Sequence, residues 1–346
     1  MTRMTMVTMM IRMNKKIGRV FTVLIITLLF VFALAGCGPG RDAAAPADPV
    51  DPAPENPAVE QNQNETSDTD GQDRNITINI PGLNAENYPR VDGSTANLPF
   101  ITKLYSGITG VSLEEAEAAV NISGGTGMVW RNLLWDGADI LIVYEAPEGI
   151  MDEFANEGIK LEIEPIGRDG LVFLVNKANP VDNLTIEQLQ GIYTGRITDW
   201  GEVGGSPGPI SAFQRNQESG SQTLFLKLLM GGLTPMTPPT DLIPDSMAGL
   251  IEAVATFDGA GGAIGFSVFY YADLMYANPD LKLLSVDGIA PSFDSIFNET
   301  YPLINDFYVV IRADSPQGSP ERLLRDWLLT DEAAALLKDA RYVPVR

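Results

Sequence analysis

The chain has 346 residues, a formal charge of −22 and no histidine. So acidic a chain lacks the basic surface that displaces counterions from nucleic acid, and we predict that it does not bind nucleic acid. The absence of histidine removes the commonest general base and the commonest metal ligand. No Asp-x-Asp-x-Asp loop of the calcium-binding type is present either. We therefore predict a protein that is not an enzyme and holds no metal or cofactor.

The N-terminal residues have the pattern of an export signal. Four basic residues between Arg12 and Arg19 precede an apolar run at 20–35, which ends in Leu-Ala-Gly before Cys37. The run is shorter than the about 20 residues of a membrane-spanning helix, and small residues at its end mark a cleavage site. The alternative is a signal anchor in which the cysteine is incidental. The sequence around Met13 favours this residue as the true start.

Cys37 is the only cysteine of the chain, so it cannot form an internal disulfide. The Leu-Ala-Gly-Cys sequence resembles the lipobox of bacterial lipoproteins. The resemblance implies a signal peptide at 1–36 and a lipid on Cys37. It places the protein on the extracytoplasmic face of the cell membrane.

Residues 37–75 are predicted to be a disordered tether. The stretch 38–74 contains six prolines and no aromatic residue, so it cannot bury a core. Removing the segment before Cys37, with its five basic residues, takes the formal charge from −22 to −27. Because such a surface repels anions at long range, an anion site must rely on local, preorganised donors.

From about residue 76 onward, apolar strand patterns alternate with helical patterns. We expect strands at 119–122, 139–144, 171–176, 262–266, 281–285 and 307–311. We expect helices at 96–106, 112–118, 128–136, 185–192, 222–231, 246–256 and 320–338. This alternation predicts an α/β fold with parallel sheets.

Two apolar strands, at 167–176 and 259–266, are entered through glycine and divide the folded part. We predict lobe I at 76–172 and 265–346, with lobe II inserted between them at 173–264. Ligands of such folds bind at the carboxyl ends of the strands, in the crevice between the lobes.

The segment 215–223 predicts an anion site. Ser219-Gly220-Ser221 opens an apolar helical pattern, and so presents hydroxyls and free N–H groups at the positive end of a helix dipole. Arg215 adds five donors in a planar fork that suits a tetrahedral oxyanion.

Three further loops carry matching chemistry. Ser94 and Thr95 precede a helical pattern, although an ordinary helix cap would have the same sequence. Thr126 lies in a glycine-rich turn between a strand and a helix, which is a common arrangement. Glu145 ends an apolar strand, where it is either a solvated carboxylate or an acceptor for a proton on the ligand. In the second case it would disfavour a fully deprotonated anion such as sulfate.

Four motifs together resemble the periplasmic-type phosphate-binding proteins of ABC importers. They are Asp-Gly-Ser-Thr at 92–95, Gly-Gly-Thr-Gly at 124–127, Ile-Tyr-Thr-Gly-Arg-Ile-Thr-Asp-Trp at 192–200, and Arg215 followed by Ser219-Gly220-Ser221. The resemblance covers residues 88–346. It implies a two-lobed type II periplasmic binding protein fold that closes over one inorganic phosphate. It also implies a monomer that delivers the ion to the permease subunits of an ABC transporter.

The resemblance further implies the ligand-binding residues Ser94, Thr95, Thr126, Glu145, Arg215, Ser219, Gly220 and Ser221. Glu145 would accept the phosphate proton, but the family has aspartate at this position, and it often has threonine at Ser221. Two other functions stay open from the residues. They are the binding of another tetrahedral oxyanion and a surface role as a phosphate sensor or adhesion protein.

Overall fold

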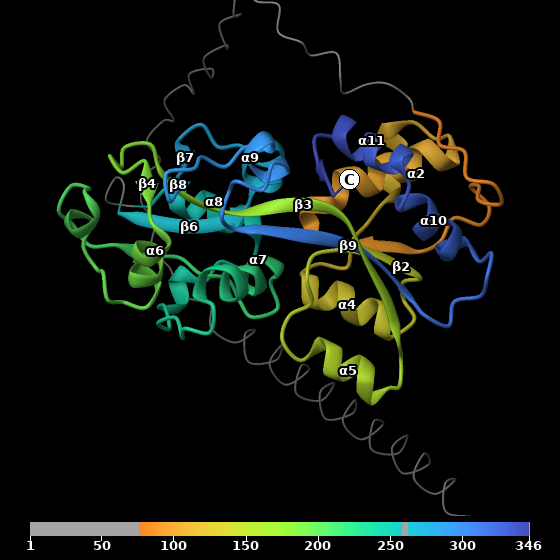
Figure 1. Cartoon of the computed structure of the whole chain (residues 1–346), viewed down its shortest axis with the longest axis horizontal. Coiled ribbons are helices and arrows are strands. Elements are labelled where there is room, and N and C mark those ends of the chain that lie inside the picture. The colour runs from red at the N-terminus through yellow and green to blue at the C-terminus, as the bar shows by residue number, and fades with distance from the viewer. Residues whose placement is uncertain (1–75, 258–261, 346) are drawn as a thin grey trace, which may run out of the picture. The chain divides into compact units, whose positions relative to one another are not determined.

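The computed structural model describes residues 76–257 and 262–345, which all belong to one compact unit, Ser67–Arg346 (Figure 1). The expected signal peptide at 1–36, the tether at 37–75 and Cys37 lie outside the described residues, and these three assignments stay predictions. Within the described ranges, no helix has the length and apolarity needed to cross a bilayer.

A mixed eight-stranded sheet forms the centre of this unit. Its strands follow the order β1-β2-β9-β3-β6-β5, and β7 and β10 also pair with β3. These strands are β1 (Val91–Gly93), β2 (Ile140–Val143), β3 (Leu161–Asn176), β5 (Ser211–Ala212), β6 (Ala263–Val268), β7 (Leu281–Leu283), β9 (Ile304–Arg312) and β10 (Val343–Pro344). A small separate sheet pairs β4 (Asn183–Leu184) with β8 (Ser285–Val286).

The long strand β3 belongs to both halves of the large sheet. Its first part, 161–170, pairs with β9, and its second part, 171–176, pairs with β6 and β7. Figure 1 shows β3 and β9 crossing between the two groups of helices. We refer to the β1-β2-β9 side as the first half of the sheet and to the β5-β6-β7 side as the second half.

The expectation of parallel sheets is wrong at the centre. Parallel pairing joins β1 to β2 and β5 to β6, whereas β2–β9, β3–β9 and β3–β6 are antiparallel. The physical reason is that the chain leaves the first half through β3 and returns through β9, so these neighbours run in opposite directions.

Helices flank both halves of the sheet. They are α2 (Leu98–Thr109), α3 (Leu113–Ala119), α4 (Thr126–Leu134), α5 (Ile150–Asn156), α6 (Ile186–Tyr193), α7 (Gly220–Leu224), α8 (Met247–Ala255), α9 (Phe293–Phe297), α10 (Pro320–Leu328) and α11 (Asp331–Asp339). The helix α7 continues directly as the π-helix Phe225–Met230, and a second π-helix spans Tyr271–Met275. Short 3-10 turns lie at Thr95–Asn97, Trp200–Val203 and Thr240–Leu242.

Two local expectations differ from the structure. The strand expected at 119–122 is absent, because Ala119 is the last residue of α3 and 120–122 form no ladder. The single helix expected at 320–338 is two helices, because the Thr330 side chain accepts a hydrogen bond from the Ala333 N–H and so caps the start of α11. The helices α5 and α9 were not expected.

Buried aromatic rings hold the second half of the sheet against its helices. Phe225 stacks on Phe266 with ring centroids 4.6 Å apart, and Tyr193 lies 4.7 Å from Phe225. Under α4, Trp130 is buried and donates its indole N–H to the Tyr144 carbonyl at 3.1 Å. These contacts hold the π-helix Phe225–Met230, which continues α7, in the second half of the sheet and α4 in the first half.

Candidate anion-binding site

A cavity of about 280 Å³ gathers seven of the eight residues predicted to bind the ligand. They are Ser94, Thr95, Thr126, Arg215, Ser219, Gly220 and Ser221. The other lining residues are Gly124, Gly125, Tyr144, Asp245, Ser246, Met247, Ala248, Val268 and Tyr271. The cavity therefore lies where the segment after β1, the start of α4 and the start of α7 meet.

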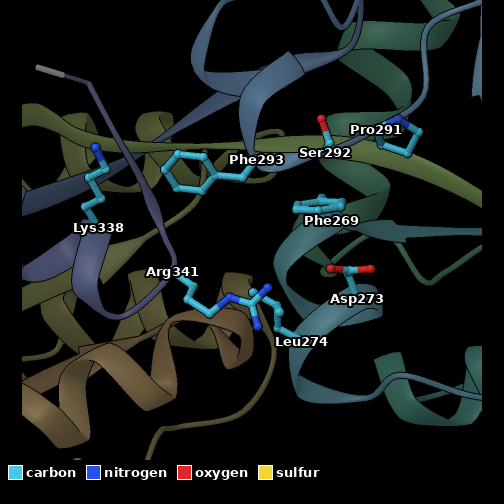
Figure 2. A pocket seen from close by; sticks show the side chains of 8 residues that line it. All are labelled: Phe269, Asp273, Leu274, Pro291, Ser292, Phe293, Lys338 and Arg341. Carbon is cyan, nitrogen blue, oxygen red and sulfur yellow. The ribbon is translucent and has the colours of Figure 1, made fainter. Parts of the chain in front are cut away.

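A second, larger cavity of about 520 Å³ contains none of the predicted residues. It is lined by Phe269, Asp273, Leu274, Pro291, Ser292, Phe293, Lys338 and Arg341, and Figure 2 shows the Arg341 side chain reaching toward Leu274. Most of this lining is only partly buried or exposed. The donor chemistry is concentrated in the smaller cavity.

Asp92 joins the first two predicted loops. One of its carboxylate oxygens accepts from the Gly93 N–H at 2.8 Å and from the Ser123 N–H at 3.0 Å, and the other accepts from the Asn132 side chain at 2.8 Å. The carboxylate thus fixes the turn that carries Ser94 beside the turn that carries Thr126.

The Ser94 hydroxyl does not act as a helix cap, although Ser94 precedes the 3-10 turn Thr95–Asn97. Its Oγ lies 3.2 Å from the Thr126 Oγ1 and accepts from the Tyr144 N–H at 3.2 Å. Ser94 is buried, and so is Thr126. This geometry argues against an ordinary cap and places both hydroxyls in the cavity wall.

The start of α7 supplies the opposite wall. Ser219 precedes α7 without capping it, and its Oγ lies 3.0 Å from the Ser221 Oγ. Both serines are buried. Gly220 allows close contact with the first wall, because a Cβ at this position would lie only 2.5 Å from the Thr126 Oγ1.

Arg215 is a buried cation, and one of its side-chain nitrogens has no hydrogen-bond partner among the described residues. Its side chain donates from Nε to the Pro244 carbonyl and from Nη2 to the Asp245 carbonyl, both at 3.0 Å. The buried Nη1 meets no acceptor among the described residues. Burial lowers the pKa of the guanidinium from 12.5 to about 10. Since a buried N–H without a partner is costly, an anionic acceptor in the cavity would complete this group.

Arg215 is also held in place through its backbone. Its N–H donates to the Gln222 Oε1 at 2.9 Å, and the Gln222 amide donates to the Gln214 Oε1 at 3.2 Å. Both glutamines are buried. Gln222 belongs to α7, so the arginine and the serine hydroxyls are positioned as one rigid group.

Glu145 is the predicted residue that the structure does not bring to the others. Its carboxylate forms an ion pair with Lys227 of the π-helix Phe225–Met230, and it is absent from the cavity lining. The preceding residue, Tyr144, lines the cavity instead. The predicted role of Glu145 as a proton acceptor finds no support in this arrangement.

The sequence reasoning missed part of the lining, above all Asp245, Ser246 and Tyr271. Ser246 caps α8 by accepting from the Gly249 N–H at 2.9 Å, and its place as the first residue of the helix expected at 246–256 is a local signal of this helix start. Among the described lining residues of this cavity, Asp245 is the one with an acidic side chain. Among the described residues, no cluster of histidine, cysteine, aspartate or glutamate could hold a metal ion.

Comparison with known proteins gives the class of the fold. A family model described as a PBP superfamily domain matches residues 55–331. A putative phosphate ABC transporter substrate-binding protein from Clostridium perfringens superposes with a TM-score of 0.58 at 22% identity, covering 74% of this chain and 99% of that chain. An ABC-type phosphate transport receptor from Vibrio cholerae superposes with a TM-score of 0.53 at 25% identity, covering 75% and 99%. The fold is that of the two-lobed type II periplasmic binding proteins, as predicted.

The chain belongs to the PBP superfamily. Among curated relatives, the phosphate-binding protein PstS of Bacillus subtilis (strain 168) is 27% identical over 177 residues, which are 51% of this chain and 55% of that protein. The protein SphX of Synechococcus elongatus is 25% identical over 198 residues, covering 55% of this chain and 57% of that protein. The chain thus spans about half the length of these curated relatives.

Proposed function

We propose that the protein is a receptor that binds inorganic phosphate in the 280 Å³ cavity and delivers it to the permease of an ABC transporter. The main support is the buried Nη1 of Arg215, which has no acceptor among the described residues. Arg215 lies in the same cavity lining as five hydroxyl-bearing residues of the predicted set. A tetrahedral oxyanion satisfies a fork of cationic N–H donors and several hydroxyls at once. The names of a phosphate-binding protein from Bacillus subtilis and a phosphate transport receptor from Vibrio cholerae, both similar to this chain, support the same ligand.

The proposed ligand contacts are the cavity-lining residues of the predicted set. Ser94, Thr95 and Thr126 donate from the first half of the sheet, and Arg215 donates from the second half together with the segment 219–221. Since Glu145 is paired with Lys227, we do not assign it a ligand contact. We propose that the carboxylate of Asp245, an acidic residue of the lining, accepts a proton from the ligand.

The division into lobes is part of this proposal. The predicted boundaries are 76–172 and 265–346 for lobe I and 173–264 for lobe II. The pairing of β6 and β7 with β3 favours a second lobe that extends to about residue 286, since both strands lie in the second half of the sheet. Closure of the lobes over the ion would remove it from water.

The proposed location is the outer face of the cell membrane, with a lipid on Cys37, and the proposed state is a monomer. Mass spectrometry of the membrane-bound protein would detect a lipidated N-terminal Cys37. A water-soluble product cleaved elsewhere would overturn the anchor without touching the phosphate site.

Calorimetry on the whole chain tests the ligand. Phosphate should bind tightly, whereas sulfate should bind at least a hundredfold more weakly, because an acceptor in the cavity favours an oxyanion that carries a proton. Equal affinity for the two ions would favour the alternative of a general tetrahedral-oxyanion binder. This alternative has one observation on its side, the position of Glu145 outside the cavity. Absence of binding to either ion would overturn the proposal.

A further inference from the structure

Glu218, which directly precedes the serines of the cavity, is attached to α4 through both its backbone and its side chain. Its carbonyl accepts from the Gly127 N–H at 3.0 Å. Its carboxylate lies 2.6 Å from the Nη1 of Arg131, with a longer contact of 3.5 Å to Nη2. Gly127 and Arg131 both belong to α4, so two separate contacts join this helix to the segment before α7.

Arg131 is held in the orientation that this contact requires. Glu153 of α5 accepts from the Nε of Arg131 at 3.0 Å and from its Nη2 at 2.7 Å. The hydrogen bonds to Glu153 and Glu218 raise the pKa of Arg131, and the bond to Arg131 lowers the pKa of Glu153. Because Glu153 fixes the planar guanidinium, less side-chain entropy is lost when Glu218 binds it.

These contacts connect the two halves of the sheet across the cavity. The helix α4 packs on β1 and β2, whereas α7 packs on β6 (Figure 1). The Lys227–Glu145 pair also joins the two halves of the sheet, since Lys227 follows α7 in the second half and Glu145 follows β2 in the first half. An ion pair between elements that separate when a cavity opens contributes its full energy to the closed state.

We propose that the Arg131–Glu218 and Lys227–Glu145 ion pairs hold the cavity closed, keeping Ser219-Gly220-Ser221 against Thr126. Arg131, Glu218, Lys227 and Glu145 are positioning residues that set the lifetime of the closed state and donate nothing to the ligand. The predicted binding role of Glu145 is thereby replaced by a role in closure. This inference rests on the proposed function for the identity of the ligand, but not for the closure itself.

The first test needs no ligand. Hydrogen exchange on the whole chain follows the Gly127 amide, whose N–H is bonded to the Glu218 carbonyl. Glu218→Gln and Glu145→Gln should each speed its exchange about two- to fivefold, as expected for the loss of one partly exposed ion pair. The effect should shrink in 1 M NaCl, since salt screens such pairs. Unchanged exchange in both variants would overturn the proposal.

The second test uses inorganic phosphate as the probe. Stopped-flow measurements should show phosphate dissociating about two- to fivefold faster from Glu218→Gln, with an unchanged association rate. Adding Arg131→Met to Glu218→Gln should add less than Arg131→Met does alone, because the two residues form one pair. Additive effects would mean that Arg131 acts only through Glu153, against the proposal.

Lys282→Met is the matched control. It removes the Lys282–Asp182 ion pair, whose residues lie on β7 and just before β4, away from α4. Neither the exchange nor the dissociation rate should change, and a change as large as that of Glu218→Gln would overturn the proposal. If phosphate does not bind at all, the proposed function fails, while the exchange measurement still decides the closure.

Discussion

Arg215→Met removes the guanidinium from the cavity while keeping an apolar side chain of similar reach. The pKa of about 10 means that the folded protein holds the charged form about 3 kcal/mol less favourably than the unfolded chain. Removing the charge recovers this cost. It also removes the two hydrogen bonds to the Pro244 and Asp245 carbonyls, which together contribute about 3 kcal/mol.

These terms oppose each other, so the free energy of unfolding without ligand should change by less than about 1 kcal/mol. Phosphate binding should weaken by about 2 to 5 kcal/mol, because the buried anion loses its cationic partner. This loss corresponds to a factor of roughly 30 to several thousand in the dissociation constant. The variant should therefore be folded and almost unable to bind.

Urea unfolding with and without phosphate, together with calorimetry, measures both quantities. Wild-type stability should rise with phosphate concentration through mass action, and that of Arg215→Met should not. Binding within fivefold of wild type would refute the assignment of Arg215. A loss of more than about 3 kcal/mol of stability without ligand would show that removing the buried charge does not offset the loss of the two hydrogen bonds.

Arg322→Met is a control with the same chemical change at another buried arginine. Arg322 is 5% exposed and donates to both carboxylate oxygens of Glu162, at 3.1 and 3.2 Å. Glu162 keeps Arg325 as a partner, so the loss comes mainly from the hydrogen bonds of Arg322 to Glu162 and to the Ser315 and Ala313 carbonyls. It should cost about 2 to 3 kcal/mol of stability and leave phosphate affinity unchanged. Arg215→Met should therefore weaken binding with little effect on stability, whereas Arg322→Met should lower stability with little effect on binding.

Three further predictions concern charge, packing and pH. Asp245→Asn should raise sulfate affinity relative to phosphate at least tenfold in calorimetry, whereas Glu145→Gln should leave this ratio unchanged; the reverse order would return the acceptor role to Glu145. Gly220→Ala should weaken phosphate binding at least tenfold, since its Cβ would lie 2.5 Å from the Thr126 Oγ1, and wild-type affinity would show that the two walls do not need this contact. Burial raises the pKa of Asp169 from 3.8 to about 6, so the folded state binds this proton more tightly than the unfolded chain. Stability from Asp169 is therefore full below about pH 4 and is lost as the pH rises through 6, by up to about 3 kcal/mol, and Asp169→Asn should remove this slope from urea unfolding measured between pH 4.5 and 7.

The cavity residues were predictable because their signals are local. A hydroxyl or glycine at the start of a helix presents donors wherever that helix is placed, so Ser94, Thr126 and the segment 219–221 could be singled out from neighbouring residues alone. Arg215 followed from its spacing to this segment. The structure brings these residues into one lining.

The partner of the Glu145 carboxylate could not be predicted from neighbouring residues, because it comes from a distant part of the chain. Lys227 is 82 positions away in the chain, and only the tertiary fold brings the π-helix Phe225–Met230 to the end of β2, where Lys227 becomes the partner of Glu145. Asp245 enters the lining in the same way, through the carbonyl contact of its backbone with Arg215. A carboxylate takes its role from the charges that surround it, and these charges come from other elements.

The sequence by itself determined the alternation of helices and strands, the helix starts that carry the donors, and the acidic charge that makes local donors necessary. The tertiary structure decided the antiparallel centre of the sheet, because β3 and β9 cross between the halves in opposite directions. It also decided that Asp245 belongs to the cavity lining, whereas Glu145 and Glu218 form ion pairs with Lys227 and Arg131. Strand direction and charge pairing depend on which distant segments pack together. This packing is set by the burial of the hydrophobic core that these segments share.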